Sequence, residues 1–461
     1  MYLIDYRSRH VLWALALSLP ITLVWLWIPH PLIAPLIGLL PLAILFVIKA
    51  PVLIGLLFML FSFFRLHEVF PQLYNLKIPL LLALATLATL AWHSLLSRKI
   101  IPYGSRELSA FAAFFLLVTL GMVFASNRPE AFSYWNATYV KIGIMTPVLA
   151  WLLREPHHFA LTLRLIAAAG VTVGGMALYN SIAGIGLIEG TRVTIGRDLG
   201  SVLGDPNDLA LVLLFPLSFA TALTLNKGNG RFDRLLGIIS GLILISAIIA
   251  TQSRGGLLGI LAVLAVFGIR RIKSKALLTT LGALTLALLF LVAGVSDRQS
   301  GGAAEEGLDE SAMGRLHAWD AAFGMALDNP LSGVGLNNFY FNYFYYSSHW
   351  DGLNHAVHST WFGVLGETGF LGLGFFLVMV VMTLRCSAST VRAVDKQSRT
   401  DPIPPSIHTI AEGNLAGLVG FCVSGTFLTQ GFTWPLYILL ALTVAVAHYA
   451  SCGKASRLTE C

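Results

Sequence analysis

The sequence predicts an all-α protein that crosses a membrane many times. Hydrophobic residues make up 56% of the 461 residues, only 11% are charged, and the mean hydropathy is +0.76. Soluble proteins carry about 25% charged residues. The apolar runs are also long enough for helices and too long for the short strands of a membrane barrel. Because the bilayer core holds no water, such a chain crosses it as hydrogen-bonded helices.

The apolar segments are joined by polar turns and give fourteen candidate spans. A helix needs about 20 residues to cross the hydrocarbon core, and most of the segments approach that length. The segments beside Pro31 and Pro51 are short, so twelve or thirteen spans is an alternative. The predicted spans are 11–29, 32–48, 52–66, 78–96, 108–125, 138–153, 161–186, 207–226, 235–251, 255–269, 276–295, 358–384, 410–428 and 433–450.

The positive charges indicate how the spans are oriented. With the N-terminus inside and the spans alternating, nine of the 30 Lys and Arg residues fall outside, which leaves 30 − 9 = 21 inside. This excess follows the positive-inside rule and predicts both termini in the cytoplasm. The net charge of +7 is therefore explained by topology, and we expect no nucleic-acid partner. The nine outer-side residues are Arg65, Lys77, Arg128, Lys141, Arg192, Arg197, Arg254, Arg298 and Arg315.

One long polar segment divides the chain into four parts. Residues 1–160 form the N-terminal membrane helices, and residues 161–295 form the central helices with outer-side arginines. Residues 296–357 form a large outer loop, and residues 358–461 form the C-terminal helices. Within the loop, the spacing of apolar residues predicts an amphipathic helix over 311–328, whose stripe lies on the membrane surface or on the bundle. The stripe consists of Met313, Leu316, Trp319, Phe323 and Leu327.

The residues able to perform chemistry collect at the outer face, while ionisable groups are scarce in the middle of the spans. The motifs are Arg192-x-x-x-Gly196, Gly204-Asp-Pro-Asn207, Ser253-Arg254-Gly-Gly, Gly314-Arg315-x-x-Ala-Trp319, Asn329-Pro330-x-x-Gly333-Val-Gly335, His358-Ser-Thr and Glu367-x-Gly369-x-x-Gly372. In their order and position, these motifs resemble those of the O-antigen ligase and polymerase superfamily. The resemblance covers roughly residues 170–385. Ser359 stands where the family usually has Asn, a variant that looks like ligases associated with exosortase-type loci.

The resemblance implies a GT-C-like membrane glycosyltransferase in the bacterial inner membrane. Its donor would be a glycan on undecaprenyl diphosphate, and its acceptor a hydroxyl on lipid A core, protein or glycan, with membrane lipids as surroundings. A Wzy-type polymerase, with a second lipid-linked glycan as acceptor, is an alternative that no residue here separates from a ligase. A lipid-glycan transporter is a further alternative, disfavoured by the scarcity of charges within spans. The resemblance implies no cofactor, and no compact ligand spacing indicates a metal.

Arginine suits a diphosphate because its planar guanidinium binds such oxygens bidentately and stays charged. We therefore assign substrate binding to four arginines and one histidine, with snorkelling helix-end charges as the alternative for the arginines. Histidine titrates near neutral pH, so His358 is the expected base, with a helix-capping role as the alternative. Glu367 is a second catalytic candidate, with a structural role as its alternative. The substrate-binding candidates are Arg192, Arg197, Arg254, Arg315 and His355.

Overall fold

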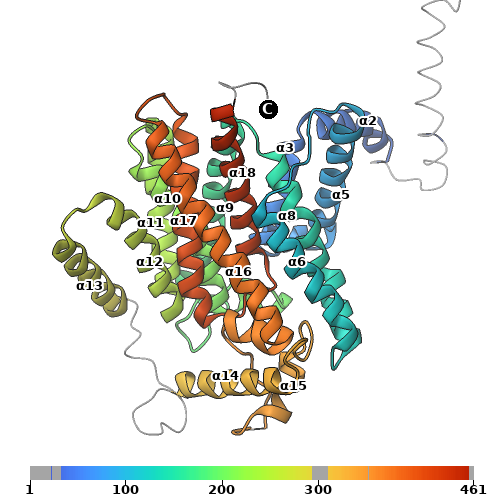
Figure 1. Cartoon of the computed structure of the whole chain (residues 1–461), viewed down its shortest axis with the longest axis vertical. Coiled ribbons are helices and arrows are strands. Elements are labelled where there is room, and N and C mark those ends of the chain that lie inside the picture. Colours follow the sequence, from blue (N-terminus) through green and yellow to red (C-terminus); the bar gives the residue numbers. More distant parts are fainter. Residues whose placement is uncertain (1–21, 23–32, 293–309, 351, 456–461) are drawn as a thin grey trace, which may run out of the picture.

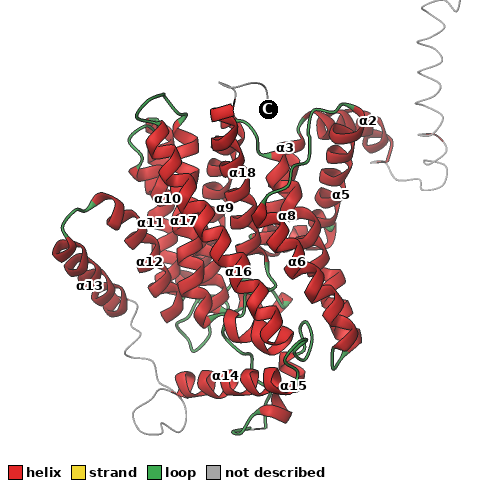
Figure 2. Cartoon of the chain, viewed as in Figure 1, coloured by secondary structure: helices red, strands yellow, loops and turns green. Residues whose placement is uncertain are grey.

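The computed structural model describes Thr22 and residues 33–292, 310–350 and 352–455. Helices joined by loops make up this part of the chain, and no strand occurs in it (Figure 2). The predicted class, an all-α polytopic membrane protein, is confirmed. The expected first span, 11–29, lies outside the described residues apart from Thr22, and so does the part of the outer loop from 296 to 309.

Each predicted span within the described residues contains a helix (Figure 1). The helices are α2 (Ile33–Lys49), α3 (Pro51–Phe63), α4 (Leu66–Val69), α5 (Ile78–Ala91), α6 (Arg106–Gly121), α7 (Arg128–Tyr134), α8 (Val140–Leu152), α9 (Pro156–Ala183), α10 (Pro206–Leu225), α11 (Arg231–Ala250), α12 (Arg254–Arg271), α13 (Lys275–Val292), α14 (Glu310–Asp328), α15 (Phe339–Tyr346), α16 (Thr360–Gln397), α17 (Pro405–Ser424) and α18 (Trp434–Ala455).

The number of spans stays a prediction. Eight helices of the described chain are long and apolar enough to cross a membrane, or nine if α2 and α3 count as one bent span. Pro51 starts α3 at a 93° bend, so neither helix of the pair is a full span by itself. A five-residue π-helix, Trp135–Tyr139, similarly joins the shorter α7 and α8. Because of these interruptions, the number of helices differs from the number of membrane crossings.

The centre of the bundle is α10, which packs against α9, α11, α12 and α17. Glycines bring these helices together: a Cβ on Gly256 of α12 would lie 2.7 Å from the Ala210 side chain of α10. Within a membrane, helices associate through such close packing, because lipid offers no hydrophobic drive between them. The packing fixes the start of α10 beside the start of α12.

The two ends of the bundle differ in their polar chemistry. We call the end with loops 184–205, 251–253 and 425–433 the site face, and the other end the opposite face. At the opposite face, Arg270 of α12 binds Asp395 of α16 (2.7 Å) and Glu412 of α17 (2.9 Å). Arg271 also binds Glu412 (2.8 Å). This ionic network ties three helices together away from the candidate residues.

Helix α14 lies across the site face, roughly at right angles to the bundle (Figure 1). It spans Glu310–Asp328, so the predicted helix over 311–328 is confirmed. Its buried face consists mainly of alanines, including Ala318 and Ala322, together with Met325; of the expected stripe, Met313 and Trp319 are half-buried. Leu316, Phe323 and Leu327 are exposed, which fits the membrane-surface alternative. Trp319 instead stacks on Phe362 of α16, so part of the stripe packs on the bundle.

The loop after α14 is bonded to α16 at an interruption of that helix. Gly369 has φ +69° and ψ −173°, so the α16 backbone opens there. The amide of Phe370 donates to the Pro330 carbonyl (2.9 Å), and the Gly366 carbonyl accepts from the Val334 amide (2.9 Å). The Asn329–Gly335 motif thus satisfies backbone groups that the opened helix leaves without helical partners. This connection sets where α14 begins and ends relative to α16.

Candidate functional site

The turn between α11 and α12 places Arg254 at the site face. Ser253 caps α12, its hydroxyl accepting from the Gly256 amide (3.2 Å), so Arg254 is the first helical residue. Its side chain is half-buried. A Cβ on Gly255 would lie 3.2 Å from the Phe427 side chain, so the turn lies directly against the 425–427 segment. The two glycines after Arg254 therefore serve close helix packing.

Arg192 is buried beneath the site face and contacts three of its segments. Its residue is only 6% exposed. The guanidinium donates to the Thr251 carbonyl (3.2 Å) and to the Asn207 side-chain oxygen (3.0 Å). It also lies 3.9 Å from the Glu189 carboxylate. Arg192 thus fixes the turn that carries Arg254 against the start of α10.

Arg315 reaches the same place from α14. Its guanidinium carbon lies 5.9 Å from the centroid of the Phe427 ring, a cation–π contact. Because Phe427 also packs against Gly255, the contact brings Arg315 close to the turn of Arg254. Arg315 and the turn that carries Arg254, about 60 residues apart in sequence, therefore both pack against Phe427.

His358 lies where the outer loop enters α16. Ser359 caps the helix, and the next residue, Thr360, donates from its hydroxyl to the Leu428 carbonyl (2.7 Å). Just before the histidine, the Val357 carbonyl accepts from the Trp319 indole of α14 (3.1 Å). His358 itself has φ +45°, a left-handed backbone conformation that is uncommon outside glycine. Both flanks are thus fixed while the histidine occupies a strained turn, a pattern frequent at functional sites.

The surroundings keep the His358 imidazole neutral. Burial lowers its pKa below the ordinary value of 6.5 because the charged form loses hydration. Arg315 and His355 lower the pKa further, while Asp205 acts in the opposite direction. These effects also show that Arg315, His355 and Asp205 all lie near His358. A neutral imidazole retains a lone pair that can accept a proton.

Asp205 and Gln430 are site-face residues whose roles the sequence did not indicate. Asp205 caps α10 by accepting from the amides of Asn207 (2.7 Å) and Asp208 (3.2 Å). The Gln430 amide nitrogen donates to Asp208 (2.6 Å), and its backbone amide donates to the Thr360 hydroxyl (3.2 Å). Gln430 thereby connects the start of α10 with the start of α16. The Gly204–Asn207 motif was the available signal for Asp205.

The remaining predicted residues lie at different places around the site. His355 is half-buried and meets Tyr343 edge to face, with 5.4 Å between ring centroids. Arg197 is exposed and lies beside Gly204, at the rim of the loop. Glu367 is buried and accepts from the amides of Asn337 (2.9 Å) and Phe339 (3.3 Å). This geometry gives Glu367 the structural role of fixing the turn before α15.

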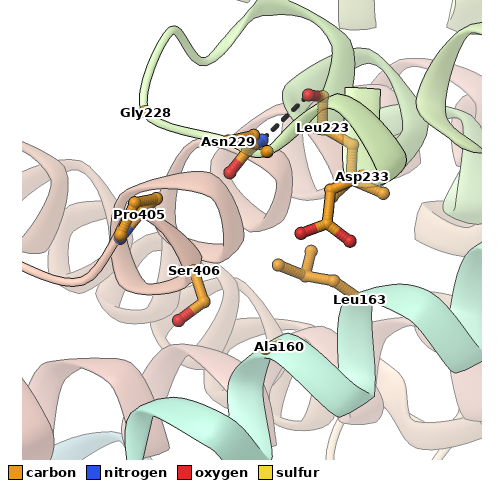
Figure 3. A pocket seen from close by; sticks show the side chains of 9 residues that line it. Ala160, Leu163, Leu223, Gly228, Asn229, Asp233, Pro405 and Ser406 are labelled. Atoms are coloured by element: carbon orange, nitrogen blue, oxygen red, sulfur yellow. Dashed lines mark hydrogen bonds between the residues drawn. The ribbon is translucent and has the colours of Figure 1, made fainter. Parts of the chain in front are cut away.

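The opposite face holds two polar features that stand apart from this cluster. One is a group of possible metal ligands, Glu155, His157 and His158, at the start of α9, where Glu155 and His158 also form the helix cap. The other is a cavity of about 190 Å³ (Figure 3). In that cavity Asp233 is paired with Arg164 (2.7 Å), and the Asn229 amide donates to the Leu223 carbonyl (2.8 Å). Its main polar groups are thus already satisfied by the protein.

The comparisons with known proteins agree with this geometry. A search of curated proteins found no match. Residues 239–377 match the sequence profile of a family described as O-antigen ligase. That range includes the Arg254 turn, α14 with Arg315, and the His358 junction. Members of the family are membrane glycosyltransferase-like enzymes. Residues 239–377 are therefore similar to the O-antigen ligase family, and this match supports membership of the superfamily of O-antigen ligases and polymerases.

Proposed function

We propose that the protein transfers a glycan from undecaprenyl diphosphate to an acceptor hydroxyl at the periplasmic side of the bacterial inner membrane. The observation that carries this proposal is His358, half-buried in a strained turn near Arg315 and Asp205, with its pKa lowered by burial. The site face would be periplasmic and both termini cytoplasmic, as the positive charges predict. The acceptor would be lipid A core, a protein or another glycan.

In the proposed step, the acceptor oxygen attacks the anomeric carbon of the donor sugar. The bond from that carbon to the diphosphate oxygen breaks, and the diphosphate leaves with the electron pair. His358 takes the proton of the attacking hydroxyl, so the new glycosidic oxygen is neutral. The family resemblance implies inversion at the anomeric carbon in this single displacement.

The residues around His358 would have different roles in the reaction. Arg315 lies over the Phe427 ring, and Arg254 precedes Gly255, which packs against the same side chain. These two arginines would bind the diphosphate, which gains negative charge as it leaves. His355 would contact the substrate from the loop, and Arg197 would meet it at the rim. Arg192 would position the Arg254 turn, since its guanidinium is bound to Thr251 and Asn207. Glu367 would position the loop that carries α15.

The test is a comparison of histidine variants in a transfer assay. His358→Ala should lower transfer by roughly 10²–10⁴-fold while donor binding persists, because a base is lost but no cation. His358→Asn serves as a second variant, since Asn tolerates the left-handed backbone but accepts no proton at neutral pH. The matched control is His317→Ala, whose ring stacks on His349 (3.9 Å) in the same loop and which should retain activity. Wild-type transfer by both His358 variants would refute His358 as the base.

The same assay separates a ligase from a polymerase. Purified protein would be given lipid-linked glycan, first with lipid A core and then with a second lipid-linked glycan as acceptor. Release of undecaprenyl diphosphate only with lipid A core supports a ligase. Release only with the lipid-linked glycan supports a polymerase. Absence of release with every acceptor class, including protein, would contradict the transferase proposal.

A further inference from the structure

A second cavity, of about 400 Å³, lies between α3, α5, α8 and α18, with part of the loop before α10 in its wall. One part of its lining is apolar and includes Phe58, Phe63, Val212 and Trp434. The other part carries hydroxyl, amide and basic groups. No acidic side chain of the described residues lines it. The polar lining residues are Ser62, Arg65, His67, Tyr134, Thr138, Lys141, Gln430 and Thr433.

The cavity reaches well into the bundle, as the packing of α3 shows. Phe63 and Phe64 pack on Phe215, with ring centroids 4.8 and 6.2 Å away, and Phe215 is halfway along α10. The helix ends there, and Arg65 follows in the left-handed conformation with φ +49°. Non-helical backbone at membrane depth is tolerated where it is buried in protein or lines a polar cavity. The break at Arg65 lines this one.

Lys141 enters the cavity from the opposite wall. Tyr134, Ala137, Thr138 and Lys141 all line it, a spacing that places them on one face of the continuous segment from α7 to α8. The segment runs from Arg128 to Leu152, so Lys141 lies near its middle. No hydrogen bond or ion pair joins the Lys141 ammonium to another described residue. Lys141 is exposed, so its ammonium can bind an anion that enters the cavity.

Arg65 is held differently. Its guanidinium Nε donates to the buried Glu68 carboxylate (2.6 Å), and a second nitrogen also contacts that carboxylate. The Arg65 side chain still keeps 34% of its surface exposed. Since Glu68 does not line the cavity, the pair presents its cationic side there. Arg65 and Lys141 therefore give the cavity positive charge, and aromatic side chains line part of its wall.

We propose that this cavity binds the phosphate group of an anionic membrane lipid, separately from the site of His358. Lys141 and Arg65 would contact the phosphate oxygens, and the hydroxyl of Thr138 would lie close enough to donate to them. The lipid chain would follow the apolar wall. A polyprenyl phosphate and a diacyl phospholipid share this phosphate chemistry, so the experiment must distinguish them.

The cavity is connected to the site of His358 through one of its lining residues. Gln430 lines it and also binds Asp208 (2.6 Å) and the Thr360 hydroxyl (3.2 Å), which flank the starts of α10 and α16. Thr360 is two residues from His358. A lipid in the cavity would therefore contact a residue that helps fix the histidine. The inference does not depend on the transfer reaction, because it concerns binding alone.

The test is native mass spectrometry of the purified full chain with defined lipids. The probes are undecaprenyl phosphate and phosphatidylglycerol, with diacylglycerol as the neutral reference. Lys141→Gln should weaken binding of at least one phosphate lipid by about tenfold to a hundredfold, the usual effect of losing a hydrogen bond to a charged group. Lys141→Arg should restore most of it. Lys49→Gln, an exposed lysine before α3, is the matched control and should change nothing.

A second variant keeps the test valid if the glutamine variant folds poorly. Ala137→Trp leaves every charge in place but fills part of the cavity, so it should weaken binding as well. A loss confined to undecaprenyl phosphate or to phosphatidylglycerol supports the proposal and identifies the source. Unchanged binding in Lys141→Gln or Ala137→Trp would overturn it. So would an equal loss in Lys49→Gln, or a loss that appears only in Arg254→Lys, which would place the lipid at the His358 site and leave the proposed function standing.

Discussion

Replacing Gly369 by alanine should detach the outer loop from α16. The residue adopts φ +69° and ψ −173°, a backbone region essentially restricted to glycine. An added methyl group would lie 2.5 Å from the Pro330 carbonyl oxygen and 2.8 Å from that of Asn329. These are backbone atoms held by hydrogen bonds to Phe370 and Gly333, so no flexible side chain is available to move aside.

The size of the effect follows from these two contributions. A non-glycine residue in such a conformation costs about 1–3 kcal/mol. Inserting a methyl group into a tightly packed site costs about 1–3 kcal/mol more. The sum, roughly 2–6 kcal/mol, is a large part of the 5–15 kcal/mol that typically stabilises a protein. We therefore expect Gly369→Ala to lower the Tm and to reduce glycan transfer, because Arg315 and the His358 junction lose their support.

The matched control is Gly374→Ala in the same helix. A Cβ on Gly374 meets nothing within 4 Å, and its backbone is helical. Alanine there should be neutral or stabilise by about 0.5–1 kcal/mol. The assay is the Tm of both purified variants in one detergent, together with transfer at matched protein levels. If Gly369→Ala kept the Tm and transfer of Gly374→Ala, the bonding between the loop and the interrupted α16 would be wrong.

Three other predictions concern charged residues of the site. Arg254→Lys should lose most transfer with an unchanged Tm, because lysine keeps the charge but not the planar fork; near-normal turnover would reduce Arg254 to a helix-end charge. Arg192→Met should instead reduce the free energy of unfolding by about 3 kcal/mol or more and so lower the Tm, because the Thr251 carbonyl and Asn207 lose their buried donor. An unchanged Tm would contradict a positioning role. A plot of kcat/KM against pH should fall only below pH 6.5, because His358 must be neutral to act as base and its pKa is lowered. In Arg315→Gln this fall should move to higher pH, because a cation that lowers the His358 pKa is gone. An unchanged pH dependence would show that Arg315 does not act on the base.

The sequence predicted the helices better than their boundaries. Long apolar runs such as 207–226 correspond closely to α10, because a buried helix that is apolar all round has a clear composition. The π-helix at 135–139 and the left-handed break at Arg65 have no such signal. Both are local departures from regular geometry that depend on packing against other helices. Predictions from apolar runs therefore placed Lys141 near the outer end of a span, while α8, which contains it, continues from α7 and the π-helix that begin at Arg128.

For the site, the residue types were predictable and their partners were not. The motifs identified Arg254, Arg315 and His358. In the structure Arg315 contacts Phe427 and acts on His358, and Gly255, next to Arg254, packs against the same Phe427. Nothing in the motif of Glu367 showed that its carboxylate would accept two backbone amides of a loop about 30 residues earlier. Such partners arise from tertiary contacts, which one sequence does not contain.

The contrast between Arg192 and Arg315 shows why a count of arginines is a poor guide to a binding site. Arg192 is buried, and its donors are directed at protein oxygens from two other segments. Arg315 is half-buried on a helix across the site face, where its guanidinium lies over the Phe427 ring. Such a ring stabilises the positive charge by a cation–π contact. Phe427 therefore helps to hold Arg315 at the site face. Arg192 thus shapes the site through its protein partners, whereas substrate binding is proposed for Arg315.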